Sequence, residues 1–493
     1  MKQTGVRRTY LVLSIVILAA LILSACQPAP TPTPAPTQPP APAEATATPA
    51  PAEPTKAPEP TKDPLAINSK ITLKVIGFKV APEEIGTPLD KAHQELITDF
   101  QTANPNVTVE ALEAPPEFDT QILVDLAAGT APDLWYADAS TLARLADSTY
   151  ILDMRKCMEL IPTLTTDRFF PTVLAIHQRP DGAIYGLPGD FTPMMIYYNP
   201  EVFAKAGVTE PANGWTWDDL LKTAQQLTID KNGKNVLDPA FDANNVVSWG
   251  FRVRKWTFEW IYRAWENGGD VISPDGTTAS GYLDSAETIE AITWLRDLVL
   301  KYKVAPPPSV LDQLNQAMGF NDRFLDGGVA MFDRGHWELV GLRNSPKFNG
   351  NNVAVAVQPS KRTNATVLYE SGYVVRADLT GDQLLAACKF VDAATGTKYQ
   401  VQKATTNLAI PANAEAAKAA AAEVAKKGET YGKIEQAFLD QVPNGRLPYG
   451  ARFAKWPAVE TILDSMMEKI LAGGDIKTEV DAAVKEINRE LSN

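Results

Sequence analysis

The pattern of apolar and polar positions changes period several times between residues 71 and 137. Residues 71–78, 107–112 and 133–137 are rich in β-branched and aromatic side chains, which predicts three strands. Between these runs, apolar residues recur at helical spacing in residues 92–100 and 122–127. This alternation predicts an α/β protein with a largely parallel sheet and helices on its faces. Ligands of such sheets bind beyond the carboxyl ends of the strands.

Two helix starts are predicted further along, after a Gly- and Pro-rich approach to an apolar strand in residues 182–203. Asn199 and Pro200 predict the first, with Asn as the N-cap and Pro at the first helical position. Thr216 and Asp219 predict the second, in a variant of the capping box that has Asp where Glu is usual.

The N-terminus has the pattern of an export signal. Lys2, Arg7 and Arg8 precede an apolar run at residues 10–23, which is shorter than the ~20 residues that span a bilayer. The sequence Leu-Ser-Ala-Cys that ends at Cys26 resembles the lipobox of bacterial lipoproteins. The resemblance implies that residues 1–25 are a cleaved signal peptide and that Cys26 is lipidated. The alternative, an uncleaved anchor, would also place the folded part outside the cytoplasm.

Residues 27–64 differ in composition from the rest of the chain. They hold 14 of its 38 prolines, and most of their other residues are Ala, Thr, Glu and Lys. Such a segment lacks the apolar side chains needed to form a core. We therefore expect residues 26–68 to be a lipidated tether between the membrane and the folded part.

Composition excludes one large class of partner. The formal net charge is -13, and it becomes -16 (43 cations minus 59 carboxylates) once residues 1–25 are removed. A protein that binds nucleic acid through a general basic surface needs clustered Lys and Arg, so we expect no nucleic-acid partner.

We also expect no metal and no other cofactor. Cys157 and Cys388 lack CxxC or CxxH spacing. The segment at residues 230–235 superficially resembles a calcium loop, but Lys234 occupies the place of an oxygen ligand, which predicts a surface turn instead. Export permits a disulfide between the two cysteines. Two buried free thiols are the alternative that the sequence favours.

Several motifs, in a specific order, resemble the family 1 extracellular solute-binding proteins of ABC transporters, which include maltose-binding protein. The resemblance runs from about residue 70 to the C-terminus. The motifs are a helix, Pro105 and a strand; Ala-Gly-Thr-Ala-Pro-Asp at 128–133; Tyr-Gly-Leu-Pro at 185–188 before Tyr-Tyr-Asn at 197–199; Trp-Thr-Trp-Asp-Asp-Leu at 215–220; Phe-Leu-Asp-Gly-Gly-Val-Ala-Met at 324–331 before Gly-His-Trp at 335–337; and a strand at 369–377.

The resemblance implies a two-lobed periplasmic-binding-protein-like fold, with a hinge of crossing strands and a ligand cleft between the lobes. By analogy, the first lobe takes residues 69–192 plus 371–430 and the second takes 193–370 plus 431–493. The implied function is capture of a solute, a mono- or oligosaccharide, at the extracytoplasmic face of a bacterial membrane, by a lipid-anchored monomer. The solute then passes to the transmembrane subunits of an ABC permease.

A sugar-binding site needs flat aromatic rings for the C–H faces of the sugar and polar groups for its hydroxyls. The resemblance makes Trp337 and Trp456 candidates for stacking on sugar rings, with packing in a lobe core as the alternative. Trp256 and Trp260 have the spacing of a buried helix face. Trp256 is a candidate because Arg254 and Lys255 precede it.

The polar candidates follow predicted strands. Tyr136 and Asp138 come at the end of the third strand, where ligands bind in this sheet type. Asp190 lies beside the presumed hinge and is otherwise a turn residue. Asp333 and Arg334 follow a strand and either bind solute or pair with each other at the surface. The remaining candidate is Tyr373, in the returning strand.

The sequence favours binding without catalysis. It lacks HExxH, GxSxG and GxxxxGK[ST], and His93, His177 and His336 have no evident partner spacing. A lipid-anchored carbohydrate-active enzyme, with two carboxylates across a cleft, stays an alternative. An adhesive or structural lipoprotein is another, although it leaves the two-lobe pattern unexplained.

Overall fold

A computed structural model describes residues 63–492, apart from 83–84, 116, 146–148 and 407–408. The predicted signal peptide, Cys26 and most of the predicted tether lie outside the described residues. No helix within the described part of the chain is long and apolar enough to cross a membrane.

The larger sheet is mixed, not largely parallel. Its strand order is β11-β4-β10-β3-β1-β2, and β12 also pairs with β10. The three strands predicted first are indeed parallel to one another. In contrast, β10 enters from much later in the sequence and runs antiparallel to β3 and β4. The strand bounds are β1 Ile71–Ile76, β2 Val107–Leu112, β3 Leu134–Asp138, β4 Leu187–Pro193, β10 Thr366–Val375, β11 Ile410–Pro411 and β12 Gly445–Arg446.

The second sheet has the order β8-β5-β9, with all pairs antiparallel. Its strands are β5 Met195–Tyr198, β8 Met331–Arg334 and β9 Ala354–Ala356, and a separate hairpin joins β6 Ile229–Asp230 to β7 Val246–Ser248. Only Met194 separates β4 from β5, so one stretch of chain belongs to both sheets. The peptide N–H of Met194 donates to Thr366 Oγ1 (3.0 Å), which ties this crossing to the start of β10.

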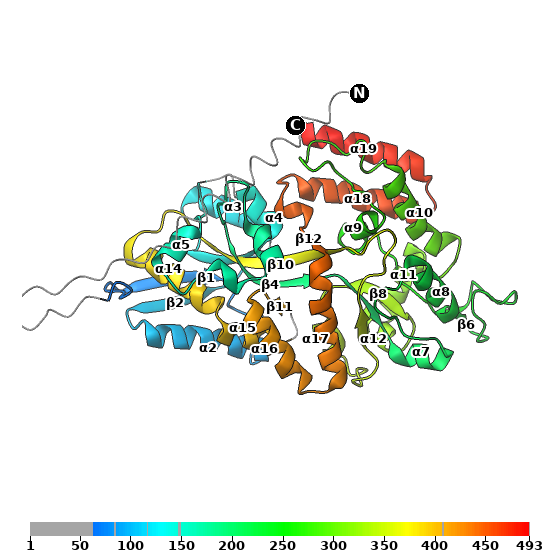
Figure 1. Cartoon of the computed structure of the whole chain (residues 1–493), viewed down its shortest axis with the longest axis horizontal. Coiled ribbons are helices and arrows are strands. Elements are labelled where there is room, and N and C mark those ends of the chain that lie inside the picture. The colour runs from blue at the N-terminus through cyan, green and yellow to red at the C-terminus, as the bar shows by residue number, and fades with distance from the viewer. Residues whose placement is uncertain (1–62, 83–84, 116, 146–148, 407–408, 493) are drawn as a thin grey trace, which may run out of the picture. The chain divides into compact units, whose positions relative to one another are not determined.

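Helices flank both sheets (Figure 1). Their bounds are α2 Pro88–Ala103, α3 Phe118–Ala128, α4 Ala139–Leu145, α5 Arg155–Leu160, α6 Pro171–Leu174, α7 Pro200–Ala206, α8 Trp217–Leu227, α9 Thr257–Glu266, α10 Ala286–Leu300, α11 Pro308–Ala317, α12 Phe320–Leu325, α13 Glu338–Asn344, α14 Gly381–Ala394, α15 Thr397–Ala404, α16 Ala414–Ala425, α17 Glu429–Gln441, α18 Trp456–Leu471 and α19 Ile476–Ser492.

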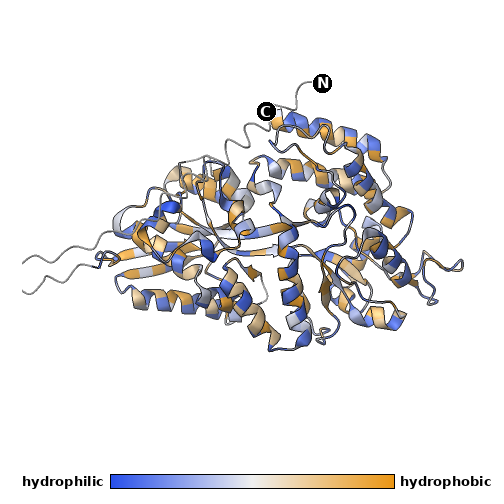
Figure 2. Ribbon diagram, in the orientation of Figure 1, coloured by the Kyte–Doolittle hydropathy of each residue, from blue (hydrophilic) through white to orange (hydrophobic). Residues whose placement is uncertain are grey.

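Local capping chemistry sets both of the helix starts predicted from sequence. Asn199 accepts a hydrogen bond from the N–H of Glu201 (3.0 Å) at the start of α7. Thr216 and Asp219 form a reciprocal capping box at the start of α8. Along helices such as α8 and α19, polar and apolar residues alternate with the helical period, so that one face of each packs against the core (Figure 2).

Two large apolar cores lie on opposite faces of the second sheet. Ile196 and Tyr198 of β5 belong to one core, which also takes residues from α8, α9, α10, α18 and α19. Met195 and Tyr197 belong to the other, which extends to the larger sheet and to α2 and α14. The period of two along β5 therefore lets one strand serve both cores.

Cys157 and Cys388 form a disulfide, which corrects the expectation of free thiols. Their Cα atoms are 5.1 Å apart, and the bond joins α5 to α14 inside the core of the larger sheet. Both residues are fully buried. The sequence favoured free thiols because 231 positions separate the two cysteines and only the tertiary packing brings them together.

Candidate functional site

Four aromatic side chains meet where the two sheets join, and we call them the aromatic cluster. The ring centroid of Tyr369, on β10, lies 6.3 Å from that of Phe258 and 6.4 Å from that of Trp337. The Trp256 ring is 6.5 Å from Phe258 and nearly parallel to it. Tyr369, Phe258 and Trp337 are half-buried, and Trp256 is 37% exposed. The four rings therefore pack near one another while part of their surface stays exposed to solvent.

Helix starts place three of the four rings. Trp256 is the N-cap residue of α9 and Phe258 lies in its first turn, while Trp337 is the N-cap residue of α13. Gly335 is required beside Trp337, because a Cβ at that position would collide with the indole ring. The predicted ligand candidates Trp256 and Trp337 thus come together through Phe258 and Tyr369.

Carboxylates of α18 lie near the aromatic cluster, and the carboxylate at the end of β3 lies near one of them. Glu460 and Asp464 lie on α18, and Asp138 ends β3. Burial raises the pKa of Glu460 to about 7, and the negative charges of Asp464 and Asp138 add to the shift. Burial also raises the pKa of Tyr369, and the negative charges of Glu460, Glu259 and Asp464 add to the shift. These interactions place the α18 carboxylates close to Tyr369 and the Asp138 carboxylate close to Glu460.

The oxygens of these carboxylates differ in how they are used. Asp464 Oδ1 accepts from the N–H and the hydroxyl of Thr257, each at 2.6 Å. Asp138 Oδ1 accepts from Ser140 Oγ (2.8 Å). Within the described part of the chain, the carboxylate of Glu460 and the hydroxyl of Tyr369 make no hydrogen bond or ion pair. These two groups therefore have polar atoms free for a ligand.

Trp456 lies next to this region but is buried. Its ring stacks on Tyr449 with centroids 4.5 Å apart, and it is 7% exposed. Tyr449 belongs to the short 3-10 helix η5 (Tyr449–Ala451). This helix packs against α4, which in turn contacts β3 and β10 of the larger sheet. A Cβ on Gly450 would be 3.0 Å from Ser140 Cβ. The Trp456 side chain thus supports the point where η5 meets α4.

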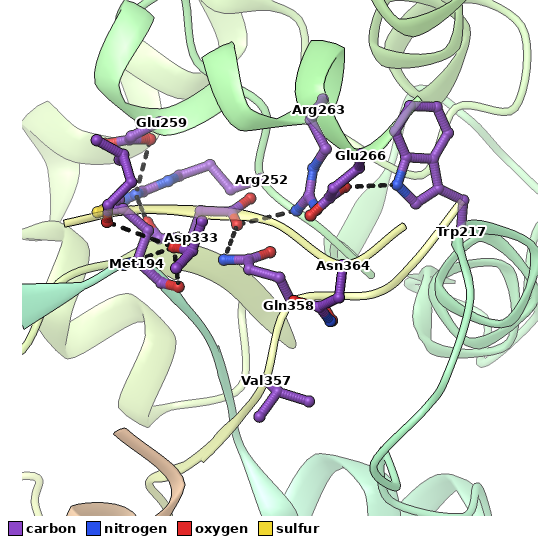
Figure 3. Close-up of polar contacts among 12 residues, drawn as sticks. Met194, Trp217, Arg252, Glu259, Arg263, Glu266, Asp333, Val357, Gln358 and Asn364 are labelled. Atoms are coloured by element: carbon purple, nitrogen blue, oxygen red, sulfur yellow. Dashed lines mark hydrogen bonds and ion pairs between the residues drawn. The ribbon is translucent and has the colours of Figure 1, made fainter. Parts of the chain in front are cut away.

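Asp333 and Arg334 do not pair with each other at the surface. Asp333 is buried and accepts from Arg263 Nη2 (2.9 Å) and Gln358 Nε2 (3.1 Å) (Figure 3). Arg334 instead forms ion pairs with Glu259 and Glu338, the latter at 2.8 Å, and its guanidinium lies over the Phe258 ring. Only Arg334 therefore borders the aromatic cluster.

Tyr136, Asp190 and Tyr373 form a second group, within the larger sheet. Lys403 Nζ donates to Asp190 Oδ2 (2.7 Å) and to the Tyr136 hydroxyl (2.9 Å), and the Tyr136 hydroxyl itself donates to Asp190. The Tyr373 ring packs 4.9 Å from that of Tyr136 and 5.7 Å from that of Phe78. The polar atoms of Tyr136 and Asp190 are thus already partnered within the protein.

Two hollows lie in the part of the chain that includes the second sheet. The first borders the aromatic cluster and the second lies at the β6–β7 hairpin. One of 260 Å³ is bordered by Arg254, Trp256 and Glu468. Another, of 790 Å³, lies at the β6–β7 hairpin and is bordered by Asp230.

Backbone N–H groups of Asn232, Lys234 and Asp242 donate to the Asp230 carboxylate, so the segment forms the predicted turn.

Four members of this region were not predicted from the sequence, although two of the four had a detectable pattern. Glu460 and Asp464 lie four and eight residues after Trp456, hence on the same face of one helix as a residue that was already a candidate. Phe258 and Tyr369 had no comparable pattern, since their position depends on the contact between α9 and β10.

Comparisons with known proteins agree on one family and one fold. A family model described as bacterial extracellular solute-binding protein matches residues 95–430. The putative ABC transporter periplasmic-binding protein YcjN of Escherichia coli is 24% identical over 409 residues, which cover 80% of this chain and 88% of YcjN. The sn-glycerol-3-phosphate-binding protein UgpB of Brucella abortus is 24% identical, over 66% of this chain and 71% of its own length.

Solved structures give the same fold. The ABC substrate-binding protein Lmo0181 of Listeria monocytogenes, in complex with cycloalternan, matches with a TM-score of 0.70 at 23% identity, covering 86% of this chain and 100% of that one. The maltose-binding protein MalE of the same species, in complex with maltose, matches with a TM-score of 0.64 at 18% identity, covering 86% and 98%. The predicted two-lobed α/β fold is therefore confirmed.

Proposed function

Because the chain belongs to the bacterial extracellular solute-binding proteins, we propose that it captures a carbohydrate and delivers it to the permease of an ABC importer. The observation that carries the choice of carbohydrate is the aromatic cluster beside the unpaired Glu460 carboxylate. Aromatic faces suit the C–H faces of a sugar, and free carboxylate oxygens suit its hydroxyls.

Each side of the proposed site has a part in binding. Trp337 and Trp256 stack on the sugar together with Tyr369, while Glu460 and Asp138 accept hydrogen bonds from its hydroxyls. Asp138 is the last residue of β3 in the larger sheet, and Glu460 lies on α18. A solute that bridges them stabilises the closed arrangement of the lobes, which is a shift in population between two states.

The lobe assignment is part of the proposal: 69–192 plus 371–430 for the first lobe and 193–370 plus 431–493 for the second. So are the monomeric state and the anchoring of the chain through Cys26 at the extracytoplasmic face of the membrane. The anchor is tested by replacing Cys26 with Ser in the expressing bacterium. Release of the protein from the membrane fraction supports lipidation, and unchanged membrane association contradicts it.

We propose no catalytic activity for this site. A glycosidase requires one carboxyl as acid and a second as base or nucleophile. The carboxylates near the aromatic cluster suit hydroxyl recognition, and the family consists of binding proteins. Product formation during incubation with an oligosaccharide, followed by chromatography, would overturn this part of the proposal.

A second candidate solute is a glycerol phosphodiester or monoester. It is favoured by the similarity to UgpB of Brucella abortus and to UgpB of Mycobacterium tuberculosis, solved with glycerophosphocholine (TM-score 0.67, 18% identity). The carboxylates Asp138, Glu460 and Asp464 count against it, because like charges repel a phosphate group.

A thermal-shift panel of maltose, cycloalternan, D-tagatose, sn-glycerol 3-phosphate and glycerophosphocholine tests the proposal. A ligand that binds only the native state raises the melting temperature. We expect a rise with at least one sugar and none with the two phosphates. A rise with the phosphates alone would replace the carbohydrate proposal with the second candidate.

The aromatic cluster is tested with a matched pair of variants. We expect Tyr369→Ala to weaken binding of the sugar found in the panel by about tenfold or more, because a stacking surface is lost. Tyr282→Ala removes another half-buried tyrosine, outside the cluster, and should leave the affinity unchanged. Equal affinities for both variants, measured by calorimetry, would remove the cluster from the site.

A further inference from the structure

Glu259 lies at the centre of a charged group behind the aromatic cluster. Its side chain is 4% exposed and lies in the first turn of α9. It accepts hydrogen bonds from Arg252 Nη2 (3.2 Å), Arg254 Nη1 (3.2 Å) and Arg334 Nη1. Three guanidinium groups from two separate segments of the chain therefore converge on one carboxylate.

The inner side of this group is fixed by packing. Arg252 is buried, with its guanidinium 3.9 Å from the ring centroid of Phe320 and 4.7 Å from that of Phe332. Its Nη2 also donates to the backbone carbonyl of Asp333 (3.2 Å). Figure 3 shows Arg252 and Glu259 beside Asp333, whose own carboxylate is held by Arg263. Glu259 therefore has a rigid support.

The outer side of the group borders the aromatic cluster. The side chains of Arg254 and Arg334 are 26% and 19% exposed. Arg254 lies over the Trp256 ring, with 5.5 Å to its centroid, and Arg334 lies over the Phe258 ring, with 5.7 Å. Among the described residues, Arg254 Nε and Nη2 and Arg334 Nη2 have no hydrogen-bond partner. Each arginine thus keeps donors for a molecule bound on the rings.

We propose that Glu259 is a positioning residue for solute binding, which holds Arg254 and Arg334 as a pair of hydrogen-bond donors at the edge of the aromatic cluster. This inference rests on the proposed function. The planar guanidinium presents its donors in a fixed geometry once one edge of it is bound, so little conformational entropy is lost when the other edge meets the solute. The pair binds neighbouring acceptor oxygens at that edge. The vicinal hydroxyls of a sugar supply them, and so do the oxygens of the phosphate candidates, which the thermal-shift panel tests.

A purely structural role for Glu259 makes a different prediction. A carboxylate in the first turn of a helix stabilises that helix through its dipole. If this were its whole role, removal of the charge would lower the melting temperature, but the folded variant would bind solute with the affinity of the natural protein. Affinity and melting temperature must therefore be measured on the same variants.

The test uses calorimetric titration of the full chain with maltose, cycloalternan and D-tagatose. We expect Glu259→Gln to weaken binding by about tenfold or more, because an amide holds guanidinium groups less firmly than a carboxylate does. Glu259→Asp should recover part of the affinity. Glu287→Gln serves as the matched control, because Glu287 also pairs with an arginine, Arg362, but away from the aromatic cluster. It should bind as the natural protein does.

If Glu259→Gln fails to fold, Arg334→Lys takes its place, since lysine keeps the charge but loses the planar donor geometry. We expect a similar loss of affinity in this variant. A folded Glu259→Gln or Arg334→Lys protein with unchanged affinity would overturn the inference and leave the proposed function intact. If the natural protein bound none of the three sugars, the carbohydrate proposal would be overturned instead, and this inference with it.

Discussion

At the scale of single residues, Glu460 has the most informative ionisation of the site. Its pKa of about 7 is above the ordinary 4.5, because the carboxylate is buried near two other carboxylates. Between these two pH values the folded state holds a proton that the unfolded state has released. The folded state therefore loses stability as the pH rises through this window.

We expect Glu460→Gln to remove this dependence. Below pH 4.5 the variant and the natural protein should have equal free energies of unfolding. Above pH 7 the variant should be more stable, by on the order of 1 kcal/mol, which is less than the full shift implies because water reaches part of the side chain. Denaturant unfolding at pH 4.5 and pH 8 measures the difference. A constant difference across the two pH values would contradict the assigned pKa.

Residue chemistry also separates the sequence candidates from one another. Trp337 and Trp256 belong to the aromatic cluster and Arg334 borders it, whereas Asp333 is bound by Arg263. Tyr136 and Asp190 are bound by Lys403. A side chain with an exposed ring face or a free polar atom is available to a solute, while one whose polar atoms are all paired must first give up a partner.

At the scale of secondary structure elements, the disulfide joins two helices that lie far apart in the sequence. Cys157 on α5 and Cys388 on α14 enclose a long loop, so the bond restricts the unfolded chain strongly. It also lies in the core, where both cysteines are fully buried. The bond therefore stabilises the contact between α5 and α14.

We expect replacement of both cysteines by serine to lower the free energy of unfolding by about 2–5 kcal/mol. Thermal unfolding with and without a reductant provides the measurement. The reductant should lower the melting temperature of the natural protein and leave that of the variant unchanged. An equal response of both proteins would show that the thiols are unpaired.

At the scale of the whole folded part, two segments meet where the sheets join. The first is the passage from β4 to β5 through Met194, and the second is the start of β10, whose strand partners β4, β3 and β12 all belong to the larger sheet. The Thr366 hydroxyl accepts a hydrogen bond from the N–H of Met194 (3.0 Å) and donates one to the carbonyl of Met194 (2.9 Å). The passage through Met194 is therefore the place where we expect a hinge between lobes.

Solute bound between the lobes should protect both of them at once. We expect a bound sugar to slow hydrogen exchange in α4 and also in η5, which pack against each other from different parts of the fold. Local opening at that contact requires the lobes to part, and the solute opposes this. Exchange followed by mass spectrometry, with glycerol as the non-binding control, measures the effect. Protection confined to one of the two segments would contradict capture between lobes.

The sequence by itself determined the features that depend on neighbours along the chain. The first parallel strands follow from apolar periodicity, and the starts of α7 and α8 follow from capping residues. Resemblance in motif order was enough for the family and the two-lobed fold. Trp337 was a candidate through the resemblance, and Trp256 through its place near a helix start beside Arg254 and Lys255.

Only the tertiary structure decided which distant residues meet. It paired Cys157 with Cys388, placed His177 2.6 Å from Glu370, and brought Tyr369 between Phe258 and Trp337. It also placed β10 antiparallel inside a sheet that begins parallel. The physical reason is that periodicity and capping act over one or two turns of chain, whereas these contacts depend on how whole elements pack.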